Sequence, residues 1–217
     1  MLTRLLLLLL TCQIAFSMRL IDQLANAHPE ESYLFQAGSQ ATLLRVKSLS
    51  KHEIEYEEIH APLCAKEIKA LDIETWLMKG APGHTAWIVA KLDAKTGEMK
   101  QARCKRRGAE ISTNDYAFTT TLFGLTFEPT PLEEQRRCGV ASDNLLPRRL
   151  WKPPLAKGLF DEAPTPYVAR WPKDGSPLSG GRIEIYLHKK VALPIWIEGK
   201  RGNLKERVHL VQFSKSQ

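Results

Sequence analysis

Several sequence features that would identify a chemistry are missing from this chain. It contains no G-x-S-x-G motif, which carries the serine nucleophile of many hydrolases, and no glycine-rich phosphate loop. Its 4 cysteines stand far apart in the sequence, whereas zinc sites need close pairs of the C-x-x-C type. We therefore expect a protein that is not an enzyme and that holds no cofactor and no metal.

Long apolar runs are also scarce, and the longest one lies at the N-terminus. Arg4 precedes an unbroken leucine run over residues 5–10, and the apolar stretch ends near Phe16, well short of the roughly 20 residues that a membrane-spanning helix needs. A positive charge, a short apolar run and then small residues are the order of a secretory signal. We expect residues 1–17 to be a signal peptide cleaved after Ser17, which leaves one globular domain over residues 18–217, exported to the periplasm or secreted.

The same segment leaves a second interpretation open. The sequence Leu9-Leu10-Thr11-Cys12 resembles a bacterial lipoprotein box, although threonine stands where a smaller residue is usual. Attachment of lipid at Cys12 would anchor the exported protein to a membrane instead of releasing it.

Few cysteines remain after the predicted cleavage. Cys64, Cys104 and Cys138 are an odd number, so at most one disulfide can form within the chain. An oxidising compartment would favour a bridge, and Cys104 with Cys138 is one possible pair. The alternative is that all three are small residues without a redox role.

The charge balance is basic but not extreme. The chain has 31 Lys and Arg against 24 Asp and Glu, with 43% hydrophobic and 25% charged residues, which are values of a globular protein. Basic residues gather within 100–107, 136–152 and 200–207. Such groups favour an anionic membrane surface or an acidic partner, or they are ordinary solvated surface. Nucleic acid is an unexpected partner for an exported protein.

The apolar pattern predicts antiparallel strands joined by hairpins. Residues 53–58 and 182–188 alternate between apolar and polar, which is the period of a half-buried strand. Helical spacing appears at 19–27 and 65–79, and no βαβ rhythm is present. We predict an α+β fold, in which a curved antiparallel sheet of about eight or nine strands carries about three helices packed on one face.

One helix start is signalled locally. Thr130 is followed by Pro131 and then by Glu133, which combines a capping box with proline at the first helical position. Gly139 would mark the end of this helix.

Aromatic residues give the only hint of a ligand site. Trp87, Trp171, Tyr186, Trp196 and Phe213 fall in predicted strands. On a curved sheet they could line an apolar concave surface, or they could simply fill the core.

Part of the sequence resembles a known group of proteins. Residues 167–180, 182–186 and 193–197, preceded by 122–125, Arg136-Arg137 and 151–154, look like the C-terminal half of uncharacterised exported proteins from chlamydia-like intracellular bacteria. That group carries no known activity, so the resemblance implies no catalytic residue.

The expected architecture is also similar, at fold level, to the periplasmic lipoprotein carriers, which have a half-open barrel with an apolar concave face. The export signal, the many antiparallel strands, the strand aromatic residues and the lack of a catalytic set lead us to expect a non-enzymatic exported protein. It would bind an acyl chain or another apolar ligand, such as a lipid or a lipoprotein, in a cavity of the curved sheet. The alternative is a secreted interaction or structural module that uses a basic surface. Fold by itself does not decide between the two.

Overall fold

The computed structural model describes residues 17–138, 149–157, 159 and 163–215. The predicted signal peptide, apart from Ser17, lies outside the described residues, as do Cys12 and Gly139.

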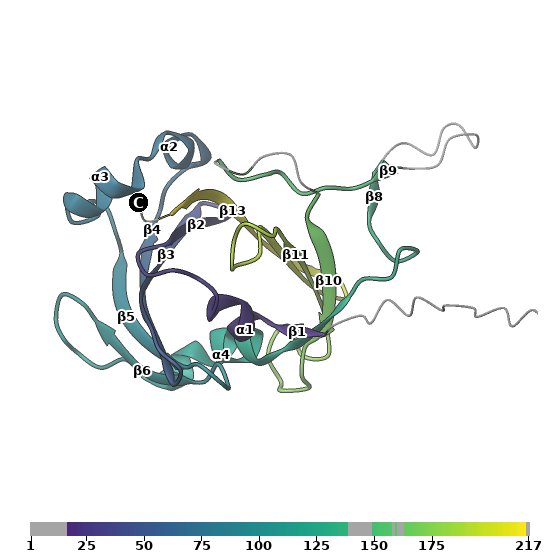
Figure 1. The fold of residues 1–217 in the computed structure, drawn as a ribbon, viewed down its shortest axis with the longest axis horizontal. Coiled ribbons are helices and arrows are strands. Elements are labelled where there is room, and N and C mark those ends of the chain that lie inside the picture. Colours follow the sequence, from purple (N-terminus) through teal and green to yellow (C-terminus); the bar gives the residue numbers. More distant parts are fainter. Residues whose placement is uncertain (1–16, 139–148, 158, 160–162, 216–217) are drawn as a thin grey trace, which may run out of the picture.

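A single antiparallel sheet of eleven strands makes up most of the described chain, in the order β1-β7-β10-β11-β12-β13-β2-β3-β4-β5-β6. Figure 1 shows this sheet curling round a central space. Its strands are β1 (Met18–Arg19), β2 (Ser32–Ala37), β3 (Gln40–Leu49), β4 (Glu53–Ala61), β5 (Ala86–Asp93), β6 (Met99–Cys104), β7 (Thr126–Pro129), β10 (Thr165–Arg170), β11 (Arg182–Leu187), β12 (Trp196–Arg201) and β13 (Leu204–Ser214). A separate pair consists of β8 (Arg137–Cys138) and β9 (Arg149–Leu150).

The predicted α+β class is wrong, because helices contribute little to this fold. The described residues form four α-helices of five to eight residues, α1 (Leu20–Leu24), α2 (Ala65–Ala70), α3 (Ile73–Met78) and α4 (Ala117–Gly124), and one 3-10 turn, η1 (Thr113–Tyr116). They do not share one face of the sheet. In Figure 1, α2 and α3 lie outside the curl, whereas α1 and α4 lie across its open side between β6 and β1.

Irregular pairing accompanies the curvature of the sheet. The register shifts between Val46 and Ser48 in β3, between Met99 and Gln101 in β6, and between Leu210 and Gln212 in β13. An extra residue in one strand bends that strand and increases its local twist. These shifts help ten-residue and eleven-residue strands to follow a curved path instead of a flat one.

Strand alternation divides the apolar residues between the two faces of the sheet. The larger core lies inside the curl and includes Phe35, Val46 and Phe127, all buried. A smaller core lies on the outer face of β2–β4, where Leu43 and Ile59 pack against α2 and α3. The structure therefore has two cores separated by one layer of strands, which explains why β2, with Tyr33 and Phe35 inside and Leu34 outside, is apolar on both faces.

The predicted helix over residues 65–79 is interrupted in the structure. Leu71 has extended backbone dihedrals, and the Asp72 side chain then caps α3 by accepting from the backbone N–H of Glu74 at 3.2 Å and of Thr75 at 3.4 Å. Aspartate stabilises a helix start better than a helix interior, so the segment forms two short helices.

The predicted helix that begins at Thr130 is wrong. Residues 131–135 form a turn in which the N–H groups of Glu134 and Gln135 bond to the carbonyl of Pro131. The chain then extends into β8, because Arg136 reaches Glu198 on β12. This long-range ion pair overrides the local capping signal.

Candidate functional site

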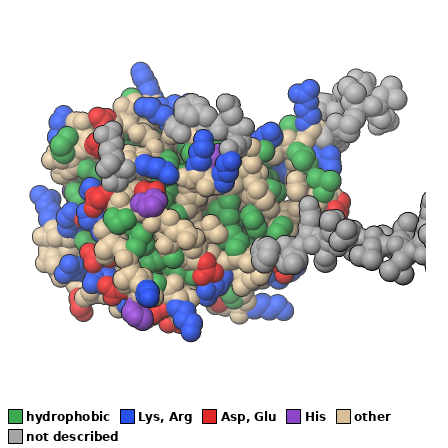
Figure 2. Space-filling view, viewed as in Figure 1, with side chains coloured by type: hydrophobic (Ala, Val, Ile, Leu, Met, Phe, Trp, Pro, Cys, Tyr) green, Lys and Arg blue, Asp and Glu red, His purple; other side chains and the backbone are tan. Residues whose placement is uncertain are grey.

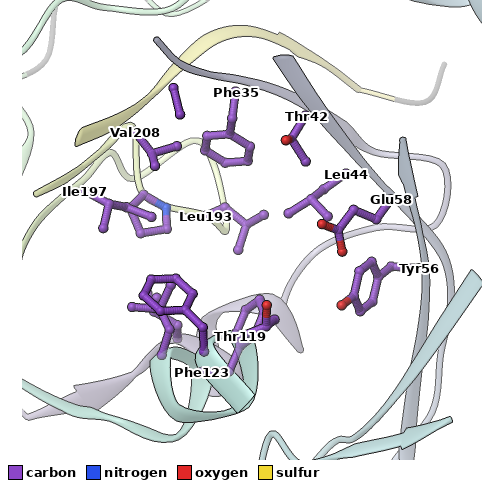
Figure 3. A pocket seen from close by; sticks show the side chains of 15 residues that line it. Phe35, Thr42, Leu44, Tyr56, Glu58, Thr119, Phe123, Leu193, Ile197 and Val208 are labelled. Carbon is purple, nitrogen blue, oxygen red and sulfur yellow. The ribbon is translucent and has the colours of Figure 1, made fainter. Parts of the chain in front are cut away.

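An apolar cavity of about 190 Å³ lies inside the curl, between the sheet and the helices of its open side. Its walls come from β2, β3 and β4 on one side, from β12, β13 and the preceding loop on another, and from α1 and α4 below (Figure 3). The main apolar side chains are Phe35, Leu44, Phe123, Leu193, Ile197 and Val208.

Strand periodicity explains why these side chains meet. Alternate residues of a strand point to the same face, so Leu44 faces the cavity while its neighbour Leu43 belongs to the outer core. Ile197 and Val208 are directly paired between β12 and β13, which brings both into the opposite wall.

The size of the cavity limits what could enter it. An engineered apolar cavity of roughly 150 Å³ binds benzene or xenon and otherwise stays dry. At about 190 Å³, this cavity matches one aromatic ring or a short aliphatic segment. It is smaller than the roughly 300–1,000 Å³ of pockets that hold drug-sized ligands.

Polar groups border the cavity on the β3–β4 side. The carboxylate of Glu58 and the hydroxyl of Tyr56 both project from β4, and Thr42 lies beside them on β3 (Figure 3). The Tyr56 side chain is buried, and its hydroxyl has no hydrogen-bond partner among the described residues. The surface of the cavity is therefore almost entirely apolar, with these polar ends at its β3–β4 border.

His60 connects two of these polar groups from outside the cavity lining. Its Nε2 lies 2.7 Å from Oε1 of Glu58, and its Nδ1 lies 3.1 Å from Oγ1 of Thr42. The hydrogen bond with Glu58 raises the pKa of His60, while burial partly opposes that rise. Glu58 is thus held in place by a neighbour on its own strand.

Burial is the main cause of the raised pKa of the Tyr56 hydroxyl. Removal from water raises the pKa of Tyr56 well above its usual range, and the negative charge of Glu58 adds to that effect. The hydroxyl of Tyr56 is therefore protonated at all physiological pH values, and it is available as a hydrogen-bond donor.

None of the five aromatic residues that the sequence proposed as ligand-binding lines this cavity. Trp171 contacts the lining from behind: it is buried, and its ring stacks at 4.9 Å on Phe118, which does line the cavity. Tyr186 and Trp196 lie on the other face of the sheet, since their strand neighbour Ile197 faces inward.

The remaining two aromatic residues are further separated from the others. Phe213 packs at 5.3 Å on Tyr33 near the end of β13. Trp87, on β5, packs against the outer core. The Nζ atom of Lys105 lies over its ring, 4.0 Å from the ring centroid. The aromatic residues that do line the cavity are not among the five that the sequence proposed; they are Phe35, Tyr56, Phe118 and Phe123.

The structure does not join Cys104 and Cys138. Both thiols are free, and Figure 1 places β6 and β8 on opposite sides of the molecule, whereas a disulfide needs Cα atoms within roughly 7 Å. Hydrogen bonds from the backbone N–H groups of Arg107 and Arg106 lower the pKa of Cys104.

Two further properties concern the described part of the chain. It contains no cluster of three or more His, Cys, Asp or Glu side chains placed to hold a metal ion. None of its helices combines the length and the apolar character required to cross a bilayer.

The fold is similar to that of one chlamydial protein of known structure. The 2.0 Å structure of the hypothetical protein CT021 from Chlamydia trachomatis matches with a TM-score of 0.68 over 92% of this chain and 93% of that chain, at 16% sequence identity. At this identity the likeness concerns the fold alone. A comparison with curated proteins finds no match.

The sequence itself also matches a family. The matching residues, 42–158, include most of the cavity wall from β3, β4 and α4, and they lie largely before the C-terminal segments on which the resemblance to chlamydial proteins rested. They make up more than half of the 217 residues. The resemblance to an uncharacterised chlamydial group is therefore confirmed, and this chain belongs to the CT021 protein family.

Proposed function

We propose that this protein binds a small apolar group in the cavity between β2–β4 and β12–β13. The observation that carries the proposal is the cavity itself, which is lined by Phe35, Leu44, Phe123 and Val208 and is filled by no side chain of the protein. Apolar surface that is left in contact with water is unfavourable, by roughly 25 cal/mol per Å². An apolar occupant would recover part of that cost, so the site is suited to binding.

The volume of the cavity limits the size of the apolar group that it can hold. A space of about 190 Å³ corresponds to one ring or a few methylene groups, so it would take part of an acyl chain and not a whole diacyl lipid. No catalytic group is needed for this role, and Glu58 with His60 serves as a fixed polar border.

Toluene is a suitable probe, because it has no polar group and fits the cavity by size. Methyl-resolved NMR of protein labelled at Leu, Val and Ile should show saturable shifts at Leu44, Leu193, Ile197 and Val208. The variant Val208→Phe places a ring in the cavity and should abolish these shifts. Val168→Phe is the matched control, since Val168 is half-buried on β10 and does not line the cavity.

The outcomes are distinct. Shifts confined to the cavity methyl groups, lost in Val208→Phe and kept in Val168→Phe, support binding at this site. Absence of saturable shifts in the wild-type protein up to the solubility limit of toluene contradicts the proposal.

A cluster of cations favours a second candidate function, contact with an anionic surface. Lys200, Lys205 and Arg207 surround the carboxylate of Glu198 together with Arg136, which also lies 3.9 Å from Glu184. However, Figure 2 shows Lys and Arg mixed with acidic and apolar side chains over the visible face, without one large basic patch. Vesicles of phosphatidylserine should retain the protein at low salt and release it at high salt if this function holds; absence of retention at low salt contradicts it.

Export is part of the proposal and rests on the order of charge, leucine run and small residues in residues 1–17. The intact mass of the protein recovered from an export-competent bacterial host tests it. Loss of residues 1–17 supports a cleaved signal, a diacylglycerol adduct at Cys12 supports the lipid-anchored alternative, and a chain that retains Met1 contradicts both.

A further inference from the structure

We infer that the cavity selects an apolar ligand that ends in an uncharged group able both to accept and to donate a hydrogen bond, a hydroxyl being the simplest example. This inference rests on the proposed function and adds the chemistry of the ligand's polar end. It is carried by Tyr56 and Glu58, which stand two residues apart on β4 and both border the cavity (Figure 3).

The hydroxyl of Tyr56 needs a partner that the protein does not provide. Tyr56 is 3% exposed, and its hydroxyl is buried without a hydrogen bond among the described residues. A buried polar group without a partner is costly, and such groups in native structures call for an explanation. A ligand atom that accepts a hydrogen bond from this hydroxyl would remove the cost.

Glu58 is satisfied by a hydrogen-bond donor on the ligand, whereas Tyr56 is satisfied by an acceptor. Its Oε1 is occupied by His60 Nε2 at 2.7 Å, and its side chain is only 14% exposed. The second oxygen, Oε2, has no hydrogen-bond partner among the described residues and stays accessible to solvent. A carboxylate can only accept, so a ligand that displaces water from this oxygen must offer a donor.

Of the common polar ends, a neutral hydroxyl satisfies both groups. Its oxygen can accept from Tyr56 while its hydrogen is donated to Glu58. A ligand carboxylate could accept from Tyr56 but would place a second negative charge beside Glu58 and would have no hydrogen to donate. An ammonium group could donate to Glu58 but has no lone pair to accept from Tyr56.

His60 reduces the electrostatic attraction between Glu58 and a cationic ligand. When protonated, it neutralises much of the charge of Glu58 at a separation of 2.7 Å. The walls around these groups, from Leu44 and Phe123, are apolar and disfavour any ionised ligand group that is not fully paired. An uncharged end avoids this penalty.

Four ligands with the same aromatic body separate these possibilities: toluene, benzyl alcohol, benzoate and benzylammonium. Each is titrated into the full-length folded protein and followed through the cavity methyl groups. Benzyl alcohol should bind more tightly than benzoate and benzylammonium. Tyr56→Phe should weaken benzyl alcohol roughly 3- to 10-fold relative to toluene, as expected for one hydrogen bond.

Two further variants complete the test. Tyr167→Phe removes a half-buried hydroxyl from β10, away from the cavity, and should change neither affinity. Glu58→Gln keeps the shape of the side chain and a group that accepts, removes its negative charge, and should narrow the preference for benzyl alcohol over benzoate. Because the Tyr56 hydroxyl has no partner to lose, Tyr56→Phe should also fold with an unchanged or higher Tm.

The results distinguish this inference from the function on which it rests. If toluene binds but benzoate or benzylammonium is the tightest ligand, or if Tyr56→Phe weakens toluene and benzyl alcohol equally, the cavity is a ligand site without the proposed selectivity, and the inference is overturned. If neither toluene nor benzyl alcohol moves the cavity methyl groups, the proposed function fails and the inference fails with it.

Discussion

Nη2 of Arg136 lies 2.6 Å from Oε1 of Glu198, although 62 residues separate them in the sequence. The Glu198 side chain has no exposed surface, and its other oxygen accepts from Nε of Arg207 at 2.7 Å. The Arg136 guanidinium also covers the ring of Trp151 at 4.4 Å. This contact fastens the segment that contains β8 and β9 to the outer face of the sheet.

Stability should fall in acid because of Glu198. Burial raises its pKa, but hydrogen bonds from Lys200 and Arg207 and the charge of Arg136 outweigh burial and lower the pKa to about 2. A carboxyl whose pKa is lower in the folded than in the unfolded state stabilises the fold above its unfolded pKa, near 4.5, and loses that contribution as pH falls toward 2. We expect a loss of about 2 kcal/mol, after allowing for screening of the exposed cations.

Urea unfolding between pH 6 and pH 2.5 measures this loss, with Glu198→Gln as the test variant. The variant should be less stable than the wild-type protein at pH 6, because four cations lose their shared carboxylate, and should depend less on pH. Glu206→Gln is the control on the neighbouring strand, where the side chain is exposed. Equal acid sensitivity of Glu198→Gln and wild type contradicts the assignment.

The outer core should contribute strongly to stability although it is small. Ile68 of α2 is 0% exposed and packs with Ile59 and Trp76 against the outer face of the sheet. Ile68→Ala should lower the free energy of unfolding by about 2–4 kcal/mol, as measured by chemical denaturation. Lys66→Ala, an exposed position on the same helix, should change it by less than about 0.5 kcal/mol; similar losses in both variants would mean that the outer core is not tightly packed.

Much of the sheet could be predicted from the sequence, because alternation is a local signal. The strands expected at 53–58 and 182–188 appear within β4 and β11. β2 was missed, because it is apolar on both faces and so does not alternate: Tyr33 and Phe35 face the inner core, whereas Leu34 faces the outer core. Burial on both faces depends on the position of a strand between two layers, which no local pattern records.

The cavity was beyond a single-sequence prediction for a related reason. Leu44, Leu193 and Val208 are ordinary strand and loop residues that meet only through the curl of the sheet. The polar side could have been noticed, because Tyr56 and Glu58 share a face with His60 by strand parity. However, the sequence does not show that β12 and β13 lie opposite them across the cavity, so the pattern of these residues predicts only a half-exposed strand.

Close backbone packing at Gly181 should make this position intolerant of a side chain. A Cβ placed there would lie 2.6 Å from the carbonyl oxygen of Lys200 and 2.7 Å from that of Leu178, far inside van der Waals contact, and neither is a flexible side-chain end. Gly181→Ala should cost about 1–3 kcal/mol of unfolding free energy. Gly124→Ala is the control, because its Cβ would meet only the Thr96 carbonyl, at 3.5 Å. If both variants are equally stable in thermal unfolding, the close approach at Gly181 is not a constraint.

The polar border of the cavity should be visible in the titration of His60. The hydrogen bond with Glu58 raises the pKa of His60 above 6.5, its ordinary value, against a smaller opposing effect of burial. A histidine whose pKa is higher in the folded than in the unfolded state stabilises the fold fully below pH 6.5 and loses that contribution as pH rises through the folded pKa. NMR titration of the imidazole resonances should therefore place His60 above 6.5 in the wild-type protein and lower it in Glu58→Gln. His209, whose pKa is lowered by burial alone, should titrate identically in both proteins, and a His60 that titrates at the same pH in both would show that its contact with Glu58 does not persist in solution.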